Sequence, residues 1–309
     1  MALFEPAFPT RADIEAAADR IRPHVRRTPV IQVELGGRPV WLKLEHLQVT
    51  GSFKARGATN AVLRMDPKPT AVVAASGGNH GLGVAHAARV VGAAPTIVVP
   101  ESVPEEKARW LIAAGARVIR HGAEYADAEA KARDLAADLG APFIHPFADP
   151  AVITGQGTVG LEIAADAPGC DAVLVAVGGG GLIAGIATAL GGTHRVIGVE
   201  PEGIPTLARA LEAGCPVEVG MESITASALG ARATAPVNLA IAQRAVERVV
   251  LVPDESILMA RDLLWEACRL AVEPAAATGL AALLRGLLDA EAPCVVLCGA
   301  NSAWTCSAH

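Results

Sequence analysis

Three glycine-rich turns in this sequence combine backbone hydrogen-bond donors with side chains that can do chemistry. They are Gly51-Ser52-Phe53-Lys54, Ser76-Gly77-Gly78-Asn79-His80-Gly81 and Gly178-Gly179-Gly180-Gly181-Leu182. A glycine turn that opens a helix presents free N–H groups and the positive end of the helix dipole, so it can bind a phosphate or a carboxylate without a basic side chain. The second and third turns are therefore candidate anion sites, and the first places a lysine at the start of a helix.

Lys54 stands where a positive charge is disfavoured. A helix is predicted to begin near Ala55, and the positive end of its dipole repels the ammonium group of the preceding residue. A lysine whose pKa is depressed can condense with an aldehyde. A lysine considered alone is more simply interpreted as a solvated side chain, but two anion-binding turns elsewhere in the chain favour the chemical interpretation.

Each anion turn also has a second interpretation. Gly179-x-Gly181-x-x-Ala184 follows an apolar run, and Glu200 closes the next one, which matches the fingerprint of a dinucleotide-binding turn. The phosphate of another ligand and a purely structural turn fit the same glycines. For the turn at residues 76–81, the alternative is a strand-to-helix corner capped by Ser76 or Asn79.

The elements around these turns alternate between strand and helix. Apolar runs predict strands at residues 39–45, 70–76, 95–100, 116–122, 142–147, 171–177, 194–201 and 293–299. Helical patterns occupy residues 10–25, 82–92, 104–115, 125–140, 155–166, 254–270 and 275–288, and a turn and helix occupy 178–191. Because parallel strands need right-handed crossovers, the predicted fold class is α/β, with two doubly wound open sheets and helices on both faces.

The composition agrees with this fold class. A chain of 309 residues is long enough for about two domains. It is 52% hydrophobic but only 3% aromatic, with 31 glycines, which favours close-packed α/β layers over a β-sandwich. The formal net charge is −6 and no basic run is present, so a nucleic-acid partner is not expected.

Targeting and membrane signals are also not expected. Residues 172–193 carry no charge and are long enough to span a bilayer, but their central glycines favour a strand, a turn and a buried helix. The six cysteines show no Cys-x-x-Cys spacing, and the N-terminus lacks a basic segment followed by an apolar one. These features predict a cytoplasmic protein with no membrane partner.

Four motifs in this order, GSFKARGA, SGGNHG, GGGGL and LCGAN, resemble the serine/threonine dehydratase (threonine ammonia-lyase) group of fold type II pyridoxal-phosphate enzymes, which are tryptophan synthase β-like. The resemblance runs from the first predicted helix to Asn301. It implies pyridoxal 5′-phosphate as cofactor, a small amino acid as substrate and a homodimer. It also implies a large cofactor-binding domain at 1–65 and 148–309, and a small domain at 66–147 that carries the SGGNHG loop.

Carried over residue by residue, the resemblance makes Lys54 the catalytic lysine, bound to the cofactor as a Schiff base. Phe53 packs beside the pyridine ring, Asn79 donates to the 3′ oxygen, and Cys298 faces the ring nitrogen; a buried strand cysteine is the alternative for Cys298. The implied phosphate cradle is Gly178, Gly179, Gly180, Gly181 and Leu182. The implied substrate-carboxylate site is Ser76, Gly77, Gly78, Asn79 and His80.

Three positions depart from the pattern of the group. Serine racemases have a second serine where this chain has Gly77, which has no proton to give. Some relatives hold a divalent cation through an acid equivalent to Glu200, but Thr206 replaces a further acid, so a metal site at Glu200 is an expectation with an incomplete ligand set. Glu273 either lines the active site or is an ordinary acid at a helix start.

The resemblance implies β-elimination, the dehydration and deamination of a β-hydroxy-α-amino acid such as L-threonine or L-serine to a 2-keto acid and ammonia, with Lys54 as general base. Phe147 and the 223–229 loop are expected to set the substrate preference. A serine racemase-type isomerase is one alternative. An NAD-dependent oxidoreductase using the turn at 179–184 is another. Little sequence follows LCGAN, so a regulatory C-terminal domain is not expected.

Overall fold

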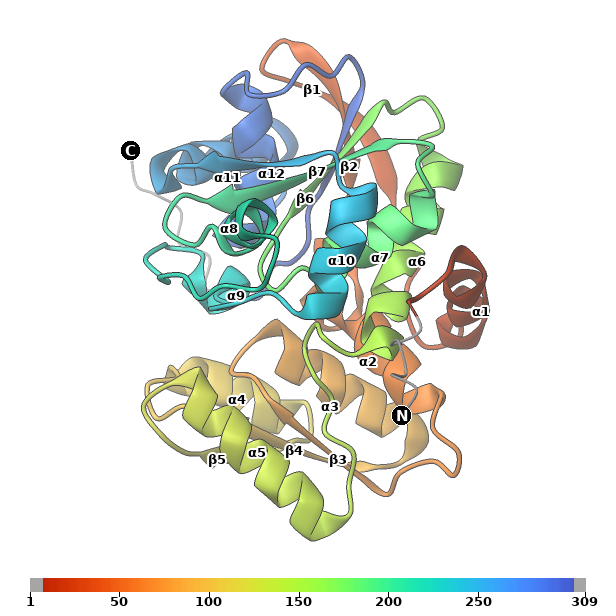
Figure 1. Cartoon of the computed structure of the whole chain (residues 1–309), viewed down its shortest axis with the longest axis vertical. Helices are drawn as coiled ribbons and strands as arrows, with labels where there is room; N and C mark the ends of the chain where they lie inside the picture. The colour runs from red at the N-terminus through yellow and green to blue at the C-terminus, as the bar shows by residue number, and fades with distance from the viewer. Residues whose placement is uncertain (1–7, 303–309) are drawn as a thin grey trace.

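Two open sheets flanked by helices organise the chain (Figure 1). The computed structural model describes residues 8–302. The larger sheet has the strand order β1-β2-β9-β6-β7-β8 and the smaller has the order β3-β4-β5. The strands are β1 (Val30–Leu35), β2 (Arg38–Lys43), β3 (Ala71–Ala75), β4 (Ala94–Val99), β5 (Arg117–Arg120), β6 (Ala172–Ala176), β7 (Arg195–Pro201), β8 (Arg248–Val252) and β9 (Pro293–Val296).

All neighbouring strands run parallel except β1, which forms an antiparallel hairpin with β2. The parallel strands are short and apolar; every residue of β6 is buried. Strands buried on both faces read as continuous apolar runs, which is why the sequence predicted them well. The predicted α/β fold class is confirmed.

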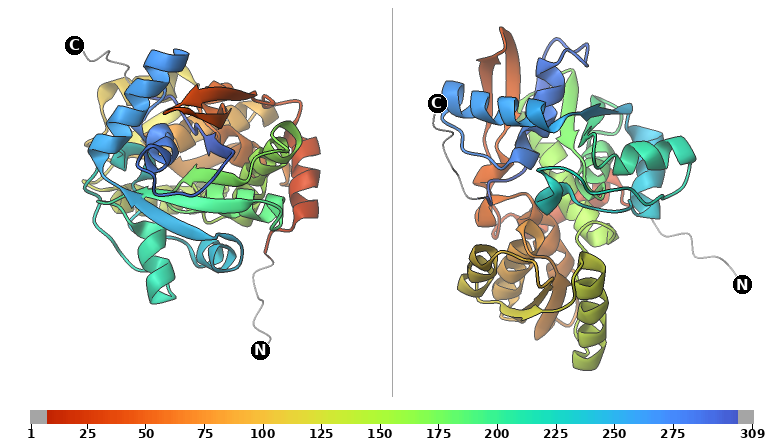
Figure 2. Two further views of the ribbon diagram at one scale, coloured as in Figure 1. Left: turned by 90° about the horizontal axis from the view of Figure 1, so that it is seen from above. Right: turned by 90° about the vertical axis from the view of Figure 1, so that its left-hand side faces the viewer.

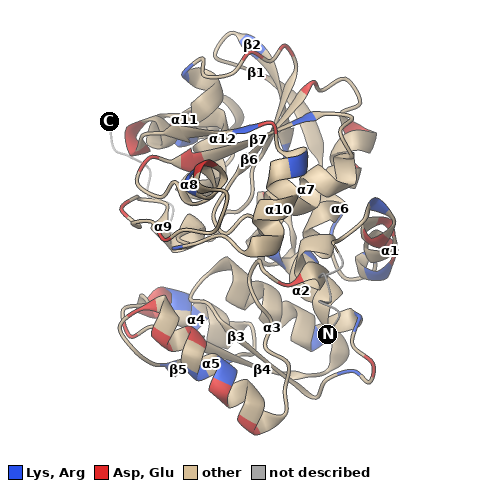
Figure 3. Cartoon of the chain, viewed as in Figure 1, with Lys and Arg blue, Asp and Glu red and all other residues tan. Residues whose placement is uncertain are grey.

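Helices cover the faces of both sheets. They are α1 (Arg11–Ile21), α2 (Lys54–Leu63), α3 (Asn79–Val91), α4 (Glu105–Ala113), α5 (Tyr125–Leu139), α6 (Pro150–Asp166), α7 (Gly181–Leu190), α8 (Thr206–Ala213), α9 (Ala226–Leu229), α10 (Pro236–Ala245), α11 (Asp254–Cys268) and α12 (Pro274–Leu284), with the 3-10 turns η1 (Glu45–Leu47) and η2 (Val49–Gly51). Charged side chains gather on outer helices such as α1, α4 and α5, whereas α7 carries none (Figure 3).

Each sheet has its own apolar core. The three-stranded sheet and its helices lie at one end of the molecule and the six-stranded sheet at the other, as Figures 1 and 2 both show. The core of the smaller sheet includes Ala58, Ala61 and Val62 of α2, together with Val152 of α6. Helix α2, which begins at Lys54, therefore lies against the core of the smaller sheet, while Phe53, directly before it, packs against the core of the larger sheet.

One predicted strand is absent, and two strands were not predicted. The segment at 142–147 is not a strand: Phe143 makes an isolated bridge with Val73, because Pro142 and Pro146 have no N–H to donate to a ladder. Strands β1 and β8 were not predicted, since they are edge strands with partly exposed residues and weak apolar runs.

The uncharged stretch at 172–193 forms β6, a glycine turn and α7, as predicted. Among the described residues, no helix has the length and apolar character needed to cross a bilayer.

Candidate active site

Lys54 lies on the wall of a cavity at the carboxyl end of the larger sheet. The lining residues are Phe53, Lys54, Asn79, Phe147, Ala176, Val177, Gly178, Gly179, Gly180, Gly181, Leu182, Ile183, Ala228, Leu229, Glu273 and Cys298. The cavity therefore brings together residues of all three glycine turns and of the LCGAN motif. A larger surface groove near α8 contains none of them.

The Lys54 amine is poised between charge states. Burial lowers the pKa of Lys54 to about 8, against the opposing influence of Cys298 and Glu273. Its Nζ donates a hydrogen bond of 2.9 Å to the carbonyl of Pro146 and lies 5.1 Å from the centre of the Phe53 ring. Near neutral pH this amine can both give and accept a proton, as a nucleophile or general base requires.

The turn that presents Lys54 has an unusual backbone. Thr50 and Gly51 have φ values of 67° and 73°, a region that residues with side chains rarely adopt. Asn301 Nδ2 donates to the Thr50 carbonyl over 2.7 Å, and the Phe53 N–H donates to the Cys298 carbonyl over 3.2 Å. These bonds attach the turn to the chain that leaves β9.

The glycine turn at 178–182 forms a cradle of free donors. The backbone N–H groups of these five residues donate to no atom of the described residues. Gly180 has a φ of 90° and leads into α7, whose helix dipole adds positive potential at the same place. Such a set of converging donors fits a phosphate group.

Packing also requires glycine in this cradle, which the sequence analysis did not foresee. A Cβ at Gly179 would lie 2.4 Å from Phe147 ring atoms, and one at Gly178 would lie 3.0 Å from the Leu229 carbonyl oxygen. Asn238 Nδ2 donates to the carbonyls of Gly179 (2.7 Å) and Phe147 (3.0 Å), so α10 holds the turn in place. A lone asparagine in an amphipathic helix carries no sequence signal for this role.

The turn at 76–80 follows β3 and opens α3. Asn79, the first residue of α3, lines the cavity, and the Gly78 N–H donates to Ser76 Oγ over 3.2 Å. His80 is turned away, since its Nε2 lies 2.8 Å from the Ile144 carbonyl and burial lowers its pKa to about 3. Its imidazole is therefore neutral and its main chain is what faces the turn.

Asn79 is held by two residues from the larger sheet. Its Nδ2 donates to Glu273 Oε1 and its Oδ1 accepts from Asn301 Nδ2, both over 2.7 Å. Glu273 precedes α12, is buried, and has its pKa raised to about 7 by burial. Of its two interpretations, the structure supports the one that places Glu273 at the cavity. Asn301 was foreseen only as part of a motif.

Comparison with known proteins decides the family. The family described as "Pyridoxal-phosphate dependent enzyme" matches residues 21–299. The chain belongs to this family. The L-threonine ammonia-lyase of Geobacter sulfurreducens is 41% identical over 299 residues, covering 93% of this chain and 74% of that protein. The L-threonine ammonia-lyase of Thermotoga maritima is 36% identical, covering 94% and 75%.

Solved structures of this pyridoxal-phosphate family superpose closely. A threonine deaminase from T.th. has a TM-score of 0.91 and 39% identity, covering 96% of this chain and all of that one. Serine racemase from Dictyostelium discoideum has a TM-score of 0.89 and 32% identity over the same shares. The resemblance stated from the four motifs is thereby confirmed.

The residues present fit the family's cofactor, pyridoxal phosphate. The free donors of residues 178–182 suit its phosphate, and the amine of Lys54 in the same cavity suits its aldehyde. Cys298 also lines the cavity, and burial raises the pKa of its thiol well above the ordinary value, so the sulfur keeps its proton. The role of each residue toward the cofactor stays a prediction.

Glu200 lies outside this cavity. Its Oε1 and Oε2 accept from the N–H groups of Leu207 (2.7 Å) and Ala208 (2.9 Å) at the start of α8. Burial raises the pKa of Glu200 to about 8 in spite of these two bonds. Within residues 8–302, no three His, Cys, Asp or Glu side chains are grouped as a metal site would need. Glu200 thus holds the start of α8, and a metal site at Glu200 stays a prediction.

The contacts of Glu200 also bear on the interpretation of residues 179–184 as a nicotinamide dinucleotide site. A dinucleotide site would need the strand-end acid free to bind a ribose. Both carboxylate oxygens of Glu200 are instead engaged with α8, and the family shown by the whole chain uses pyridoxal phosphate. The NAD-dependent interpretation of residues 179–184 is therefore not retained.

Proposed function

We propose that this enzyme is a serine/threonine dehydratase, which converts L-threonine or L-serine to a 2-keto acid and ammonia. The observation that carries the proposal is the buried Lys54 amine, with a pKa of about 8, in one cavity with the free donors of residues 178–182. Similarity to two L-threonine ammonia-lyases over more than nine-tenths of this chain supports the same activity.

Each side chain has a distinct task in this proposal. The cofactor, when bound, supplies an electron sink for the bonds at the substrate Cα. Lys54 would hold the cofactor, and its free Nζ would take the proton from the substrate Cα. The N–H groups of residues 178–182 would hold the phosphate. Phe53 would pack beside the ring, and the protonated Cys298 would face the ring nitrogen.

The substrate carboxylate is assigned to the turn at 76–80. We place it against Ser76 and the backbone of Gly77, Gly78 and His80, while Asn79 holds the cofactor's 3′ oxygen. Gly78 approaches the 223–229 loop, since a Cβ there would lie 3.5 Å from the Ser227 carbonyl oxygen. We propose that this segment, which includes α9, and Phe147 contact the substrate side chain and so set the substrate preference.

A keto-acid assay over L-threonine, L-serine and 3-hydroxyaspartate tests the proposal. Lys54→Ala should abolish both keto-acid formation and the visible absorbance band of the bound cofactor. Lys68→Ala, which removes an exposed lysine beyond the other end of α2, is the matched control and should retain both. A Lys54→Ala enzyme that forms keto acid at the wild-type rate would contradict the assignment.

An isomerase is the second candidate, because a serine racemase superposes at 32% identity. The structure argues against a second proton donor at residue 77: a Cβ there would lie 2.6 Å from Val103 Cγ2, so Val103 fills the space a side chain would need. Incubation with L-serine should therefore give pyruvate and ammonia without D-serine. Accumulation of D-serine, detected by chiral chromatography, would favour the isomerase.

The domain division at 1–65 and 148–309 against 66–147 remains our proposal, supported by separate cores for the two sheets. In this division α2 and the start of α6 form the contact between the domains. We further propose a homodimer, which light scattering on the purified enzyme tests. A reducing, cytoplasmic location is supported by the described cysteines, which are free thiols.

A further inference from the structure

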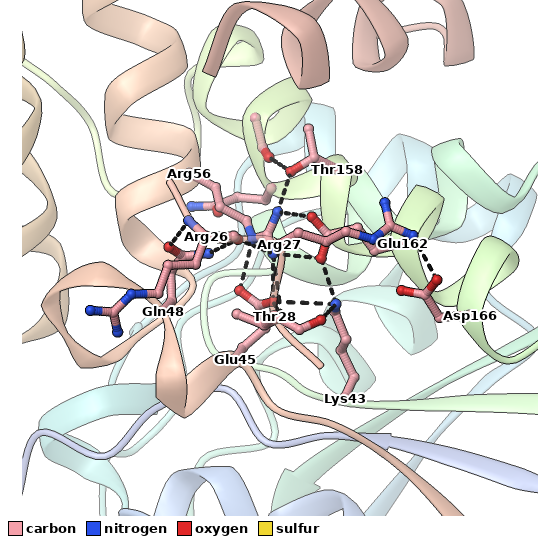
Figure 4. A network of polar contacts seen from close by, with 12 residues as sticks. Arg26, Arg27, Thr28, Lys43, Glu45, Gln48, Arg56, Thr158, Glu162 and Asp166 are labelled. Atoms are coloured by element: carbon pink, nitrogen blue, oxygen red, sulfur yellow. Dashed lines mark hydrogen bonds and ion pairs between the residues drawn. The ribbon is translucent and has the colours of Figure 1, made fainter. Parts of the chain in front are cut away.

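Arg56, two residues after Lys54, belongs to a buried group of four charged side chains, here called the ion cluster: Lys43, Glu45, Arg56 and Glu162 (Figure 4). They come from the end of β2, from η1, from α2 and from α6. Lys43, Glu45 and Arg56 are at most 1% exposed, and the Glu162 side chain is 12% exposed. The cluster does not line the cavity and has no part in the chemistry proposed above.

Arg56 is the centre of the cluster. Its Nε and Nη2 donate to the two carboxylate oxygens of Glu45 over 2.8 and 2.7 Å, and its Nη1 and Nη2 donate to those of Glu162 over 2.7 and 2.8 Å. Lys43 donates to Glu162 and to the Thr28 carbonyl. Two cations thus face two anions, and the planar guanidinium is fixed by both carboxylates.

Stability alone is a weak reason for such a cluster. Burying four charges carries a large desolvation cost, and well-packed apolar residues often stabilise a fold equally well. Apolar side chains form no directional hydrogen bonds, whereas the planar guanidinium group of an arginine holds its partners in one orientation. This contrast points to a role in fixing geometry.

The geometry that the cluster can fix is that of residues 46–55, the segment that leads into α2 and contains Lys54. Lys43 and Glu45 precede this segment and Arg56 follows it, so the cluster joins its two ends. Between them lie Thr50 and Gly51 with positive φ, and a strained backbone of this kind persists only where its surroundings hold it.

Lys54 and Arg56 share the first turn of α2. Successive helical residues are rotated by about 100° around the axis. Lys54 and Arg56 are two positions apart, so their side chains leave the helix on nearly opposite sides. Arg56 is bound to α6 and η1, while Lys54 is directed into the cavity. A rotation of this turn about the helix axis would break the Arg56 contacts and move the Lys54 amine.

We propose that the ion cluster positions Lys54: Arg56, held by Glu45 and Glu162, fixes the first turn of α2 and thereby the direction of the Lys54 amine toward the cofactor aldehyde. Arg56 is thus a positioning residue. The inference rests on the proposed bond between Lys54 and the cofactor. It does not depend on which amino acid is the substrate.

Arg56→Lys and Glu162→Gln test the inference. The first keeps a positive charge without the fork, and the second keeps the shape of the carboxylate without its charge. Pyridoxal phosphate is added to cofactor-free enzyme; the Lys54 amine condenses with the aldehyde with loss of water. Borohydride then reduces the C=N bond, and peptide mass spectrometry gives the modified fraction over time. Both variants should react at least about tenfold more slowly, since a displacement near 1 Å can cost about 100-fold.

A second measurement separates positioning from general damage. In a Lys54→Ala background the affinity for pyridoxal phosphate reports the cradle alone, and adding Arg56→Lys or Glu162→Gln should leave it unchanged within about twofold. Arg27→Lys is the matched control, because the Arg27–Asp166 ion pair lies beside the cluster and shares no hydrogen bond or ion pair with its four members among the described residues. It should react at the wild-type rate.

The outcomes are distinct. Wild-type reaction rates in both cluster variants would overturn the inference, and so would a parallel loss of affinity in the Lys54→Ala background. If Arg56→Lys does not fold, Glu162→Gln decides. A wild-type enzyme whose Lys54 is not modified would contradict the proposed function and this inference together. Because the trapping needs no turnover, failure of the keto-acid assay alone would leave the positioning result valid.

Discussion

Burial controls the protonation of the groups around Lys54. It lowers the pKa of the lysine to about 8, raises that of Glu273 to about 7, and keeps the thiol of Cys298 protonated. In the cofactor-free enzyme, the amine and the carboxyl therefore change charge within about a unit of neutral pH. Asn79 donates a hydrogen bond to the Glu273 carboxyl group, so a change in the charge of Glu273 changes the strength of a bond to a residue of the cavity wall.

Glu273→Gln should remove a pH dependence of stability. The folded state raises the pKa of Glu273 from an ordinary 4.5 to about 7, because burial outweighs the hydrogen bond from Asn79 and the opposing charge of Lys107. Its protonated form is favoured by folding, so this stabilisation is present below pH 4.5 and is lost as the pH rises through 7. As the pH rises from 4.5 to 7, the free energy of unfolding of the cofactor-free wild type should therefore fall relative to that of Glu273→Gln. The fall should be at most about 1.4 kcal/mol per pH unit.

Denaturant unfolding of both proteins between pH 5 and 8 measures this difference. The amide of the variant retains an oxygen that can accept from Asn79, so the contact itself is preserved. If the difference in the free energy of unfolding between the two proteins stays constant over this range, the pKa of Glu273 is not raised.

Gly77→Ser should overpack the turn at 76–80. The added Cβ would lie 2.6 Å from Val103 Cγ2, and inserting atoms into a packed site typically costs about 1–3 kcal/mol. We expect a lower kcat/KM for deamination and a lower melting temperature. Val103→Ala in the same chain should recover both. Equal defects in the single and double variants would mean that Val103 is not the obstacle.

At the scale of elements, glycines let helices approach one another. Helices α6 and α7 meet where a Cβ at Gly185 would lie 2.5 Å from the Ile153 carbonyl oxygen and 2.6 Å from the Gly157 nitrogen. Since α7 begins at the glycine turn of residues 178–182 and α6 carries Glu162, this contact connects the wall of the cavity with the ion cluster.

Gly185→Ala should destabilise the fold and weaken cofactor binding together. Because the obstacle is backbone on α6, the two helices must separate, which we expect to cost about 1–3 kcal/mol. Gly169→Ala is the control, since a Cβ there meets no atom within 4 Å. Denaturant unfolding and cofactor titration check both effects. A Gly185→Ala protein as stable as Gly169→Ala would disprove the close contact.

At the scale of the whole molecule, the cavity is assembled from both sheets. Asn79 comes from the helix that follows β3 of the smaller sheet. Gly178 follows β6 and Cys298 follows β9 of the larger sheet, and Glu273 directly precedes α12. A ligand that contacts all of them stabilises the folded arrangement in proportion to its binding free energy.

Removal of pyridoxal phosphate should therefore lower the melting temperature of the whole chain. At a cofactor concentration about 100 times its dissociation constant, the folded state gains about 2.7 kcal/mol. The melting temperature should rise with added cofactor and saturate. In Lys54→Ala the rise should be smaller, because the covalent bond is absent. Equal melting curves with and without cofactor in the wild type would contradict a site shared by the two sheets.

The sequence determined much of the fold and the most specific parts of the site. Buried parallel strands such as β6 are continuous apolar runs, and turns that approach a ligand or another helix require glycine, so both leave local signals. Lys54 and the glycine turns stand out in the sequence by themselves, whereas the roles of Asn79 and Cys298 come from the family resemblance; all of these residues line one cavity.

Only the tertiary structure decided which distant residues meet. Asn238 reaches the cradle from α10, Asn301 joins Asn79 across 222 positions, and Arg56 finds Glu162 across 106. The partners of Glu200 also depend on packing, since both oxygens of its carboxyl group accept from N–H groups at the start of α8. A single polar residue leaves no periodic pattern, so its partner depends on how the sheets and helices pack, which no local stretch of sequence records.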